Sequence, residues 1–403
     1  MHVQPRSSIL IGIALFAATA GALAFLPGQQ PQPDPSDHPV VIAPKQGQRP
    51  VVEAVFVLDT TGSMGGLIQA AKDKVWSIAS TLAAAEPAPE IRMGLVAYRD
   101  RGDAYVTRVT DLTPDLDALH AALFQLEAQG GGDAPESVNQ ALHEAVDDIS
   151  WGKAPNAYRV VFLVGDAPPH MDYQDDVPYP ETLAIARERG IRVNAIQVGN
   201  GTDTRGIWQQ VAQLGDGAYL HLAQDGNAVA IATPYDKKLA KLSAELDDTR
   251  LYYGSAAERE ARAEGLAASK AVRDAAPAPV LARRATFAAS GSGKAALLGD
   301  KELVDAVTTG SVALEEIAPE ALPEPLQGLS ADAQRSVIAE QAGRREAIRQ
   351  QIEATARRRT EYLREKVAAD AGAADSLDQK LFETVREQAR SLGLRYNADA
   401  PAY

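Results

Sequence analysis

Between residues 51 and 222, runs of consecutive apolar residues alternate with segments whose apolar residues recur every three or four positions. The apolar runs predict strands buried on both faces, and the longer spacing predicts amphipathic helices. The expected strands lie at residues 51–58, 90–100, 105–109, 160–165, 191–198 and 218–222. The expected helices lie at residues 67–82, 116–126, 134–149, 180–189 and 207–214. This alternation predicts an α/β fold with a doubly wound, mostly parallel sheet at residues 51–231.

After residue 231 the pattern becomes helical. Residues 232–299 predict a helical linker region, in which Leu239, Leu242 and Leu246 form a stripe that can dock on the α/β domain. Its residues 256–299 are rich in Ala and predict helix and linker with little core of their own. Residues 300–403 predict a helical C-terminal region, in which residues 331–369 form one long helix and a candidate coiled coil. The apolar seam of this helix consists of Ile348, Ile352, Leu363 and Val367. A last helix near residues 376–392 is expected to pair with it as a helical hairpin.

The first 50 residues have the pattern of an export signal and a spacer. Residues 9–26 are uncharged and mostly apolar, follow Arg6, and contain the small-x-small sequence Ala22-Leu23-Ala24. A run of about 18 residues is also close to the minimum that spans a bilayer, so residues 1–26 fit a cleaved signal peptide or a retained membrane anchor. Seven prolines in residues 27–50 predict an extended spacer. We therefore expect an exported protein, periplasmic or at the cell surface, with no other membrane contact.

Composition excludes several classes of function. The chain has 403 residues and a formal net charge of -14 at pH 7, which disfavours nucleic acid as a partner because phosphate binding calls for a basic face. It has no cysteine, which excludes disulfides, thiolate metal sites and cysteine nucleophiles.

A cluster of oxygen-bearing side chains follows the first predicted strand. Asp59, Thr61 and Ser63 come directly after the apolar run at residues 55–58. In open α/β sheets, ligands bind at the carboxyl ends of the strands. Carboxylates and hydroxyls are hard ligands that suit Mg²⁺, Mn²⁺ or Ca²⁺, whereas zinc and copper favour His and Cys. The run therefore predicts a divalent-cation site.

The segment Asp59-Thr60-Thr61-Gly62-Ser63 resembles the first motif of the metal-ion-dependent adhesion site of von Willebrand factor type A domains, of the kind found in exported bacterial proteins. The family's last motif, an Asp that ends a later strand, is matched by Asp166. The family's middle residue is a Thr, and this chain has Asp133 there instead. The resemblance covers residues 51–231 and implies a metal held by Asp59, Thr61, Ser63, Asp133 and Asp166.

Asp133 also has a second interpretation. The sequence Asp133-Ala134-Pro135-Glu136 is a good capping box, with Glu136 three residues after the cap, so Asp133 would begin the helix at residues 134–149. Two other groups near the site are expected to be structural. The tripeptide Arg101-Gly102-Asp103 predicts a hairpin turn, and the acids that follow His170 predict a solvated loop rather than a second metal site. These acids are Asp172, Asp175 and Asp176.

The resemblance implies a function in binding a protein partner, commonly through an acidic residue that completes the metal's coordination. Asp133 would work against this, because three carboxylates around a divalent ion leave a formal charge of about -1. An alternative is an envelope-organising protein whose metal only stabilises the fold, and a metal-dependent hydrolase is a weaker one. We do not expect an enzyme, since the sequence places no nucleophile beside a general base and the segment at residues 291–294 lacks the remaining residues of a phosphate-binding loop.

Overall fold

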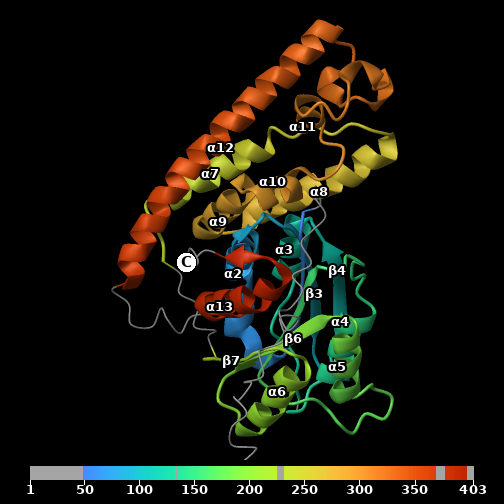
Figure 1. Ribbon diagram of the computed structural model, residues 1–403, viewed down its shortest axis with the longest axis vertical. Coiled ribbons are helices and arrows are strands. Elements are labelled where there is room, and N and C mark those ends of the chain that lie inside the picture. Colours follow the sequence, from blue (N-terminus) through green and yellow to red (C-terminus); the bar gives the residue numbers. More distant parts are fainter. Residues whose placement is uncertain (1–48, 133, 225–230, 369–376, 397–403) are drawn as a thin grey trace, which may run out of the picture. The chain divides into compact units, whose positions relative to one another are not determined.

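The computed structural model describes residues 49–132, 134–224, 231–368 and 377–396 (Figure 1). The predicted signal segment, most of the spacer and Asp133 lie outside these ranges. Within the described ranges, no helix combines the length and apolar character needed to cross a membrane.

The sheet is mostly parallel, as predicted. Its strand order is β4-β3-β1-β5-β6-β7, in which only the β3–β4 pair is antiparallel. The strands are β1 (Val51–Asp59), β3 (Glu90–Tyr98), β4 (Thr107–Thr113), β5 (Tyr158–Gly165), β6 (Ile191–Val198) and β7 (Tyr219–Leu222). Because β1 and β5 are parallel neighbours, the residues that follow them meet at the same edge of the sheet.

Helices cover both faces of the sheet, which confirms the doubly wound architecture (Figure 1). One face packs on α4 (Val138–Asp147), α5 (Tyr179–Glu188) and α6 (Thr202–Leu214). The other face packs on α2 (Gly65–Ala83), α3 (Leu116–Phe124) and α13 (Leu377–Ala389). The helices α5 and α6 end beside Gly190 and Gly215, as their sequence pattern predicts.

Several predicted boundaries differ from those in the structure, and two of the differences lie near the site. The third strand, expected at residues 105–109, runs from Thr107 to Thr113, because the turn before it is longer than the tripeptide alone. The helix expected from residue 134 begins at Val138, and Ser137 precedes it without a side-chain cap. The backbone of Glu136 instead forms a bridge to Pro169. The capping-box interpretation therefore fails.

The rest of the described chain is helical, as predicted. It contains α7 (Asp236–Asp247), α8 (Ala256–Ala275), α9 (Ala278–Ala289), α10 (Gly291–Leu298), α11 (Leu303–Thr308) and α12 (Ala331–Ala368). Short 3₁₀ turns occur at Gly62–Met64, Leu314–Glu316, Pro319–Ala321, Glu324–Leu326 and Arg390–Leu392. A small antiparallel pair joins β2 (Ala85–Glu86) to β8 (Arg395–Tyr396), far apart in the sequence.

The segment expected to have little core is in fact well packed. Most of α9 is buried, and its alanines share an apolar cluster with Leu239 of α7 and with Ile348 and Ile352 of α12. The long helix α12 therefore packs on α7 and α9 (Figure 1). Small Ala side chains allow this close approach of helices, so an Ala-rich sequence does not imply an unpacked linker.

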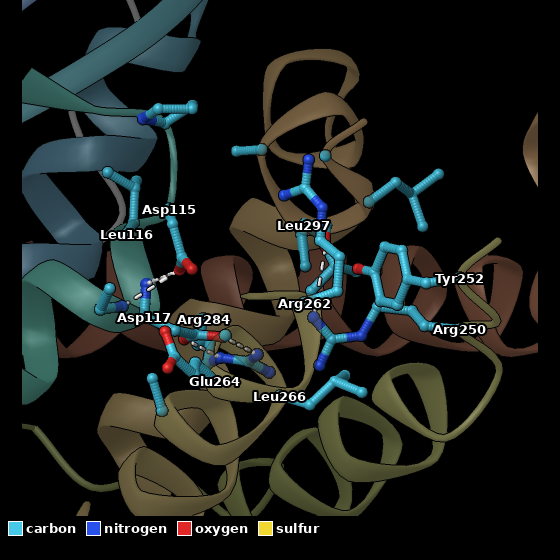
Figure 2. Close-up of a pocket in the computed structure, with 18 of the residues that line it drawn as sticks. Asp115, Leu116, Asp117, Arg250, Tyr252, Arg262, Glu264, Leu266, Arg284 and Leu297 are labelled. Carbon is cyan, nitrogen blue, oxygen red and sulfur yellow. Dashed lines mark hydrogen bonds and ion pairs between the residues drawn. The ribbon is translucent and has the colours of Figure 1, made fainter. Parts of the chain in front are cut away.

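Buried pairs of arginine and acid join the helices to one another and to the α/β part. Arg284 of α9 donates from Nε to Asp117 Oδ1 at 2.6 Å (Figure 2). Its Nη2 donates to Asp247 Oδ1 at 3.0 Å. Two arginines of α12 form similar pairs, Arg345 with Glu302 and Arg359 with Asp236. Removing one member of such a pair leaves an uncompensated buried charge and typically costs about 3–5 kcal/mol. The pair Arg284–Asp117 thus fixes α9 against α3.

A cavity of about 280 Å³ lies beside this pair (Figure 2). Its lining includes Asp115, which caps α3, together with Tyr252 and Arg262. None of Asp59, Thr61, Ser63 and Asp166 contributes to the lining, so the cavity is separate from the predicted metal site.

The last helix does not pair with α12. Instead α13 packs on α2, and Leu381, Phe382 and Val385 enter the apolar cluster under that face of the sheet. Gln388 of α13 contacts two neighbouring strands: it accepts a hydrogen bond from Tyr158 of β5 at 2.7 Å and donates to Asn194 of β6 at 2.7 Å. The α/β fold is therefore completed by a helix that follows it by about 150 residues in the sequence, counted from residue 231 to residue 377.

We predict that Phe382→Ala lowers the free energy of unfolding by about 3–5 kcal/mol, because Phe382 is 3% exposed and its removal leaves a cavity over the sheet. Urea denaturation of the full chain measures this. Leu329→Ala is the control, since Leu329 is 40% exposed and should change stability by less than about 0.5 kcal/mol. Equal effects of the two substitutions would contradict the placement of α13.

His120 of α3 is held as a neutral imidazole. Its Nδ1 accepts from Trp76 Nε1 at 2.8 Å, and its Nε2 lies 2.9 Å from the carbonyl oxygen of Lys72, to which it donates. Burial lowers the pKa of His120 to about 4, against a usual value near 6.5. Between about pH 4 and pH 6.5, His120 therefore binds a proton in the unfolded chain but not in the folded chain.

Stability from His120 is therefore fully present above about pH 6.5 and is lost as the pH falls toward 4. We predict that, relative to His120→Gln, the wild type loses about 1.4 kcal/mol of unfolding free energy between pH 7.5 and pH 5.5. Paired urea titrations at the two pH values measure the difference. A constant difference would show that folding leaves the pKa of His120 unchanged.

Candidate metal centre

Asp59 lies at the carboxyl end of β1 and is completely buried. Its Oδ1 accepts hydrogen bonds from the backbone N–H and the hydroxyl of Thr61, at 2.8 and 2.7 Å. Its Oδ2 is buried without a hydrogen-bond partner. The absence of a side chain at Gly165 leaves room for this carboxylate. A Cβ at residue 165 would lie 3.2 Å from Asp59 Oδ2 and 2.4 Å from the hydroxyl oxygen of Tyr98. An unpartnered buried carboxylate oxygen costs free energy and is available to a ligand.

The hydroxyl groups of Thr61 and Ser63 lie next to each other, beside Asp59. The short turn Gly62–Met64 brings Ser63 Oγ to 3.3 Å from Thr61 Oγ1. Thr61 is buried, whereas Ser63 is exposed. The structure therefore brings the first three predicted ligands together, with the open side at Ser63.

Asp166 joins them from the neighbouring strand. It follows β5, is partly exposed, and its charge acts on Asp59. Its Oδ2 accepts a hydrogen bond from Gln224 Nε2 at 3.0 Å, and the same nitrogen donates to the carbonyl oxygen of Ser63 at 3.0 Å. Gln224 thus links the two predicted motifs. It was missed in the sequence because it lies after the edge strand, with no motif around it.

Burial raises the pKa of Asp59 to about 7, with a further increase from the charge of Asp166. The two hydrogen bonds from Thr61 oppose this increase but do not cancel it. A carboxylate that is costly to ionise by itself is stabilised when a cation binds beside it.

The loop that should supply the middle ligand packs on the first motif. The N–H of Gly62 donates to the carbonyl of Gly130 at 3.1 Å, and the N–H of Gln129 donates to that of Thr60 at 3.1 Å. Asp133 itself is outside the described residues, so its role stays a prediction. Another acid of this loop, Glu136, is 3% exposed and lies near the site. Sequence reasoning assigned Glu136 to a helix cap and missed it here.

The acids that follow His170 form ion pairs, whereas the sequence predicted solvated side chains. Asp175 and Asp176 pair with Arg101 at 2.9 and 2.7 Å. Asp172 accepts from His170 Nδ1 at 2.8 Å. Arg101 belongs to the Arg-Gly-Asp tripeptide, which forms the predicted turn between β3 and β4.

The donor set fits a hard divalent cation. Two carboxylates and two hydroxyls converge at one sheet edge, and one carboxylate oxygen is buried without a partner. In the part of the chain that the structure describes, no three His, Cys, Asp or Glu side chains converge as a metal cage. An ion here would therefore depend on the hydroxyls of Thr61 and Ser63 and on water.

Comparison with known proteins agrees with this geometry. Residues 53–234 match the family described as von Willebrand factor A domain. A stretch of 120 residues is 28% identical to a putative ariadne-like RING finger protein, R811, of Acanthamoeba polyphaga mimivirus, and covers 30% of this chain and 11% of that protein. A stretch of 121 residues is 28% identical to the alpha-protein kinase vwkA of Dictyostelium discoideum, and covers 30% of this chain and 19% of the kinase. The matched stretch thus spans less than a fifth of either relative.

Solved structures of proximal thread matrix protein 1 from the mussel byssus are also similar. One of them, with 16% identity and a TM-score of 0.34, covers 44% of this chain and 43% of that chain. Another is described as having a zinc-occupied metal-ion-dependent adhesion site, with 16% identity, a TM-score of 0.35 and the same coverage.

The sheet topology and the motif at Asp59 agree with the family match. Residues 53–234 of this chain form a von Willebrand factor A domain.

Proposed function

We propose that this protein binds a protein partner through a divalent cation held at the carboxyl edge of its sheet. The observation that carries the proposal is the unpartnered Oδ2 of the buried Asp59, beside the exposed Ser63. Asp59, Thr61, Ser63 and Asp166 would hold the ion, with Asp133 as a further candidate. When bound, the ion supplies positive charge at a surface that is otherwise acidic.

Each residue has a separate part in this proposal. Asp59 supplies the buried charge, and Thr61 fixes the orientation of its carboxylate through Oδ1. Gln224 donates to both Asp166 and the Ser63 backbone, so it keeps the loops that carry Asp166 and Ser63 next to each other. Ser63 lies at the open side, where a partner's oxygen would approach. Binding energy from such a site depends on a preformed arrangement of donors.

The hydroxyls fit ligation better than catalysis. Thr61 Oγ1 donates to Asp59, and Ser63 Oγ contacts Thr61 rather than a histidine. A nucleophile would need an adjacent base that is free to accept its proton. We therefore propose a binding protein rather than an enzyme.

One alternative is supported by a specific observation. The charges of buried acids crowd together at this edge, and an ion alone would relieve that repulsion. The metal of an envelope-organising protein would then only stabilise the fold. Crosslinking and pull-down from the native envelope, with Mg²⁺ or with chelator, separates the two. A partner captured only with Mg²⁺ supports binding, and identical captures under both conditions support the structural alternative.

We predict that Mg²⁺ or Mn²⁺ raises the melting temperature of the wild type and does not raise that of Asp59→Ala. An ion at a hundredfold excess over its Kd adds about 2.7 kcal/mol to the stability of the folded state. Differential scanning calorimetry across a metal titration measures the shift. Asp175→Ala is the matched control, because Asp175 is an exposed acid paired with Arg101, and it should keep the full shift. Equal shifts in wild type and Asp59→Ala would refute the site.

We also propose that the protein is exported, on the basis of the apolar run at residues 9–26 and the Arg that precedes it. Mass spectrometry of the N-terminus from a fractionated native host tests this. A chain that starts at Phe25 supports cleavage, and a full-length chain in the membrane fraction supports an anchor. Recovery of full-length chain from the cytosol would contradict export.

A further inference from the structure

Glu136 is fixed in place by the loop that follows Asp166. Its backbone N–H donates to the carbonyl of Pro168 at 2.9 Å, and its own carbonyl accepts from the N–H of His170 at 3.0 Å and from that of Val138 at 2.8 Å. The backbone of Glu136 is therefore tied to the same loop that carries Asp166. Such backbone hydrogen bonds fix the point from which the side chain extends, without help from a ligand.

The side chain of Glu136 reaches the first motif. Gly131 lies between Glu136 and Thr61. A Cβ built on Gly131 would lie 3.2 Å from Glu136 Oε1 and 3.0 Å from the Cβ of Thr61, so the carboxyl group and Thr61 are close to the same glycine. Gly131 has a φ of +76°, which a residue with a side chain rarely adopts. The loop thus approaches closely enough for Glu136 to face the region around Asp59.

Glu136 has unused hydrogen-bonding capacity, unlike its neighbours Asp100 and Asp103. Asp100 accepts from Ser137 Oγ at 2.8 Å and from the hydroxyl of Tyr173 at 3.0 Å. Asp103 accepts from the N–H of Gly131 at 3.1 Å. Glu136 Oε2, in contrast, is buried without a partner, although Glu136 is only 3% exposed. A buried polar atom of this kind calls for a ligand, an ion or a water that the protein binds.

The charges around Glu136 favour a cation nearby. Burial, and then the charges of Asp59, Asp100, Asp103 and Asp166, raise the pKa of Glu136 to about 9. All of these neighbouring charges have the same sign. Two unpartnered buried oxygens, Glu136 Oε2 and Asp59 Oδ2, therefore occur at one acidic edge of the sheet.

We propose that Glu136 is a positioning residue of the metal site, which accepts a hydrogen bond from a water molecule bound to the ion. The inference rests on the proposed function, since it requires an ion at Asp59 and Asp166. A water-mediated contact agrees with the absence of a three-acid cage among the described residues. Mg²⁺ usually keeps several of its waters, and residues that hold such waters control affinity without ligating the ion.

The test is a calorimetric titration of the full chain with Mg²⁺ and with Mn²⁺, for the wild type and for Glu136→Gln. The amide has nearly the same shape as the carboxyl group but attracts the ion-bound water more weakly. Loss of a residue in this position typically weakens metal affinity about 10–100-fold, and we expect a decrease of this size. In chelator, the melting temperature of Glu136→Gln should be equal to or higher than that of the wild type, because the amide cannot acquire the charge that burial and the neighbouring acids disfavour.

Asp103→Asn is the matched control. It removes one charge from the same cluster, but its remaining oxygen can still accept the hydrogen bond from Gly131. We expect its metal affinity to change by less than about threefold, since only the screened charge is lost. A similar loss in both variants would show that charge alone acts, and would overturn the positioning role of Glu136.

The outcomes separate this inference from the proposed function. If the wild type binds the ion and Glu136→Gln binds it equally tightly, the role of Glu136 is wrong and the metal site remains. If the wild type binds no divalent ion, both proposals are wrong. A lower melting temperature in chelator with unchanged affinity would assign Glu136 a purely structural role. If Glu136→Gln does not fold, Glu136→Asp replaces it, because it draws the carboxyl group back by one methylene and should weaken affinity in the same direction.

Discussion

The structure depends on one electrostatic constraint, the presence of buried acids that lack a basic partner at the carboxyl edge of the parallel sheet. Asp59 is completely buried and one of its oxygens has no hydrogen-bond partner, and the same holds for one oxygen of Glu136. Elsewhere in the chain, buried acids are paired with arginines, as in Asp117 with Arg284 and Glu302 with Arg345. The contrast between compensated and uncompensated acids locates the functional edge, because proteins rarely leave buried charges unpaired without a ligand.

The helical region supports this edge at a distance. Lys380 of α13 donates to the carbonyl of His221 in β7 at 2.6 Å, three residues before Gln224. Gln224 in turn contacts Asp166 and the backbone of Ser63. The C-terminal helix is thus connected to the metal-site loops through the edge strand. Because α13 also covers one face of the sheet, the α/β part and the helical region share a single apolar core on that side.

The middle loop of the site differs from the family pattern in a way that the fold accommodates. Where the family has a Thr, this chain has Asp133, and α4 begins only at Val138, after the bridge between Glu136 and Pro169. The backbone of Glu136 pairs with the loop after β5, and its carboxyl group lies beside Gly131, close to Thr61. More acidic groups at this edge strengthen the attraction for a divalent ion, but they also offset its charge toward an acidic partner.

The sequence by itself determined the strands, most helices and the convergence of Asp59 with Asp166. These follow from local periodicity and from the rule that parallel strands end at one edge, so nearby residues contain the information. Only the tertiary structure decided the positions of Gln224, Glu136 and α13. Their contacts join segments far apart in the chain, as when Tyr158 meets Gln388. An amphipathic helix shows in its sequence that one face is buried but not what covers it, and a carboxyl group after a turn looks the same whether it caps a helix or faces an ion.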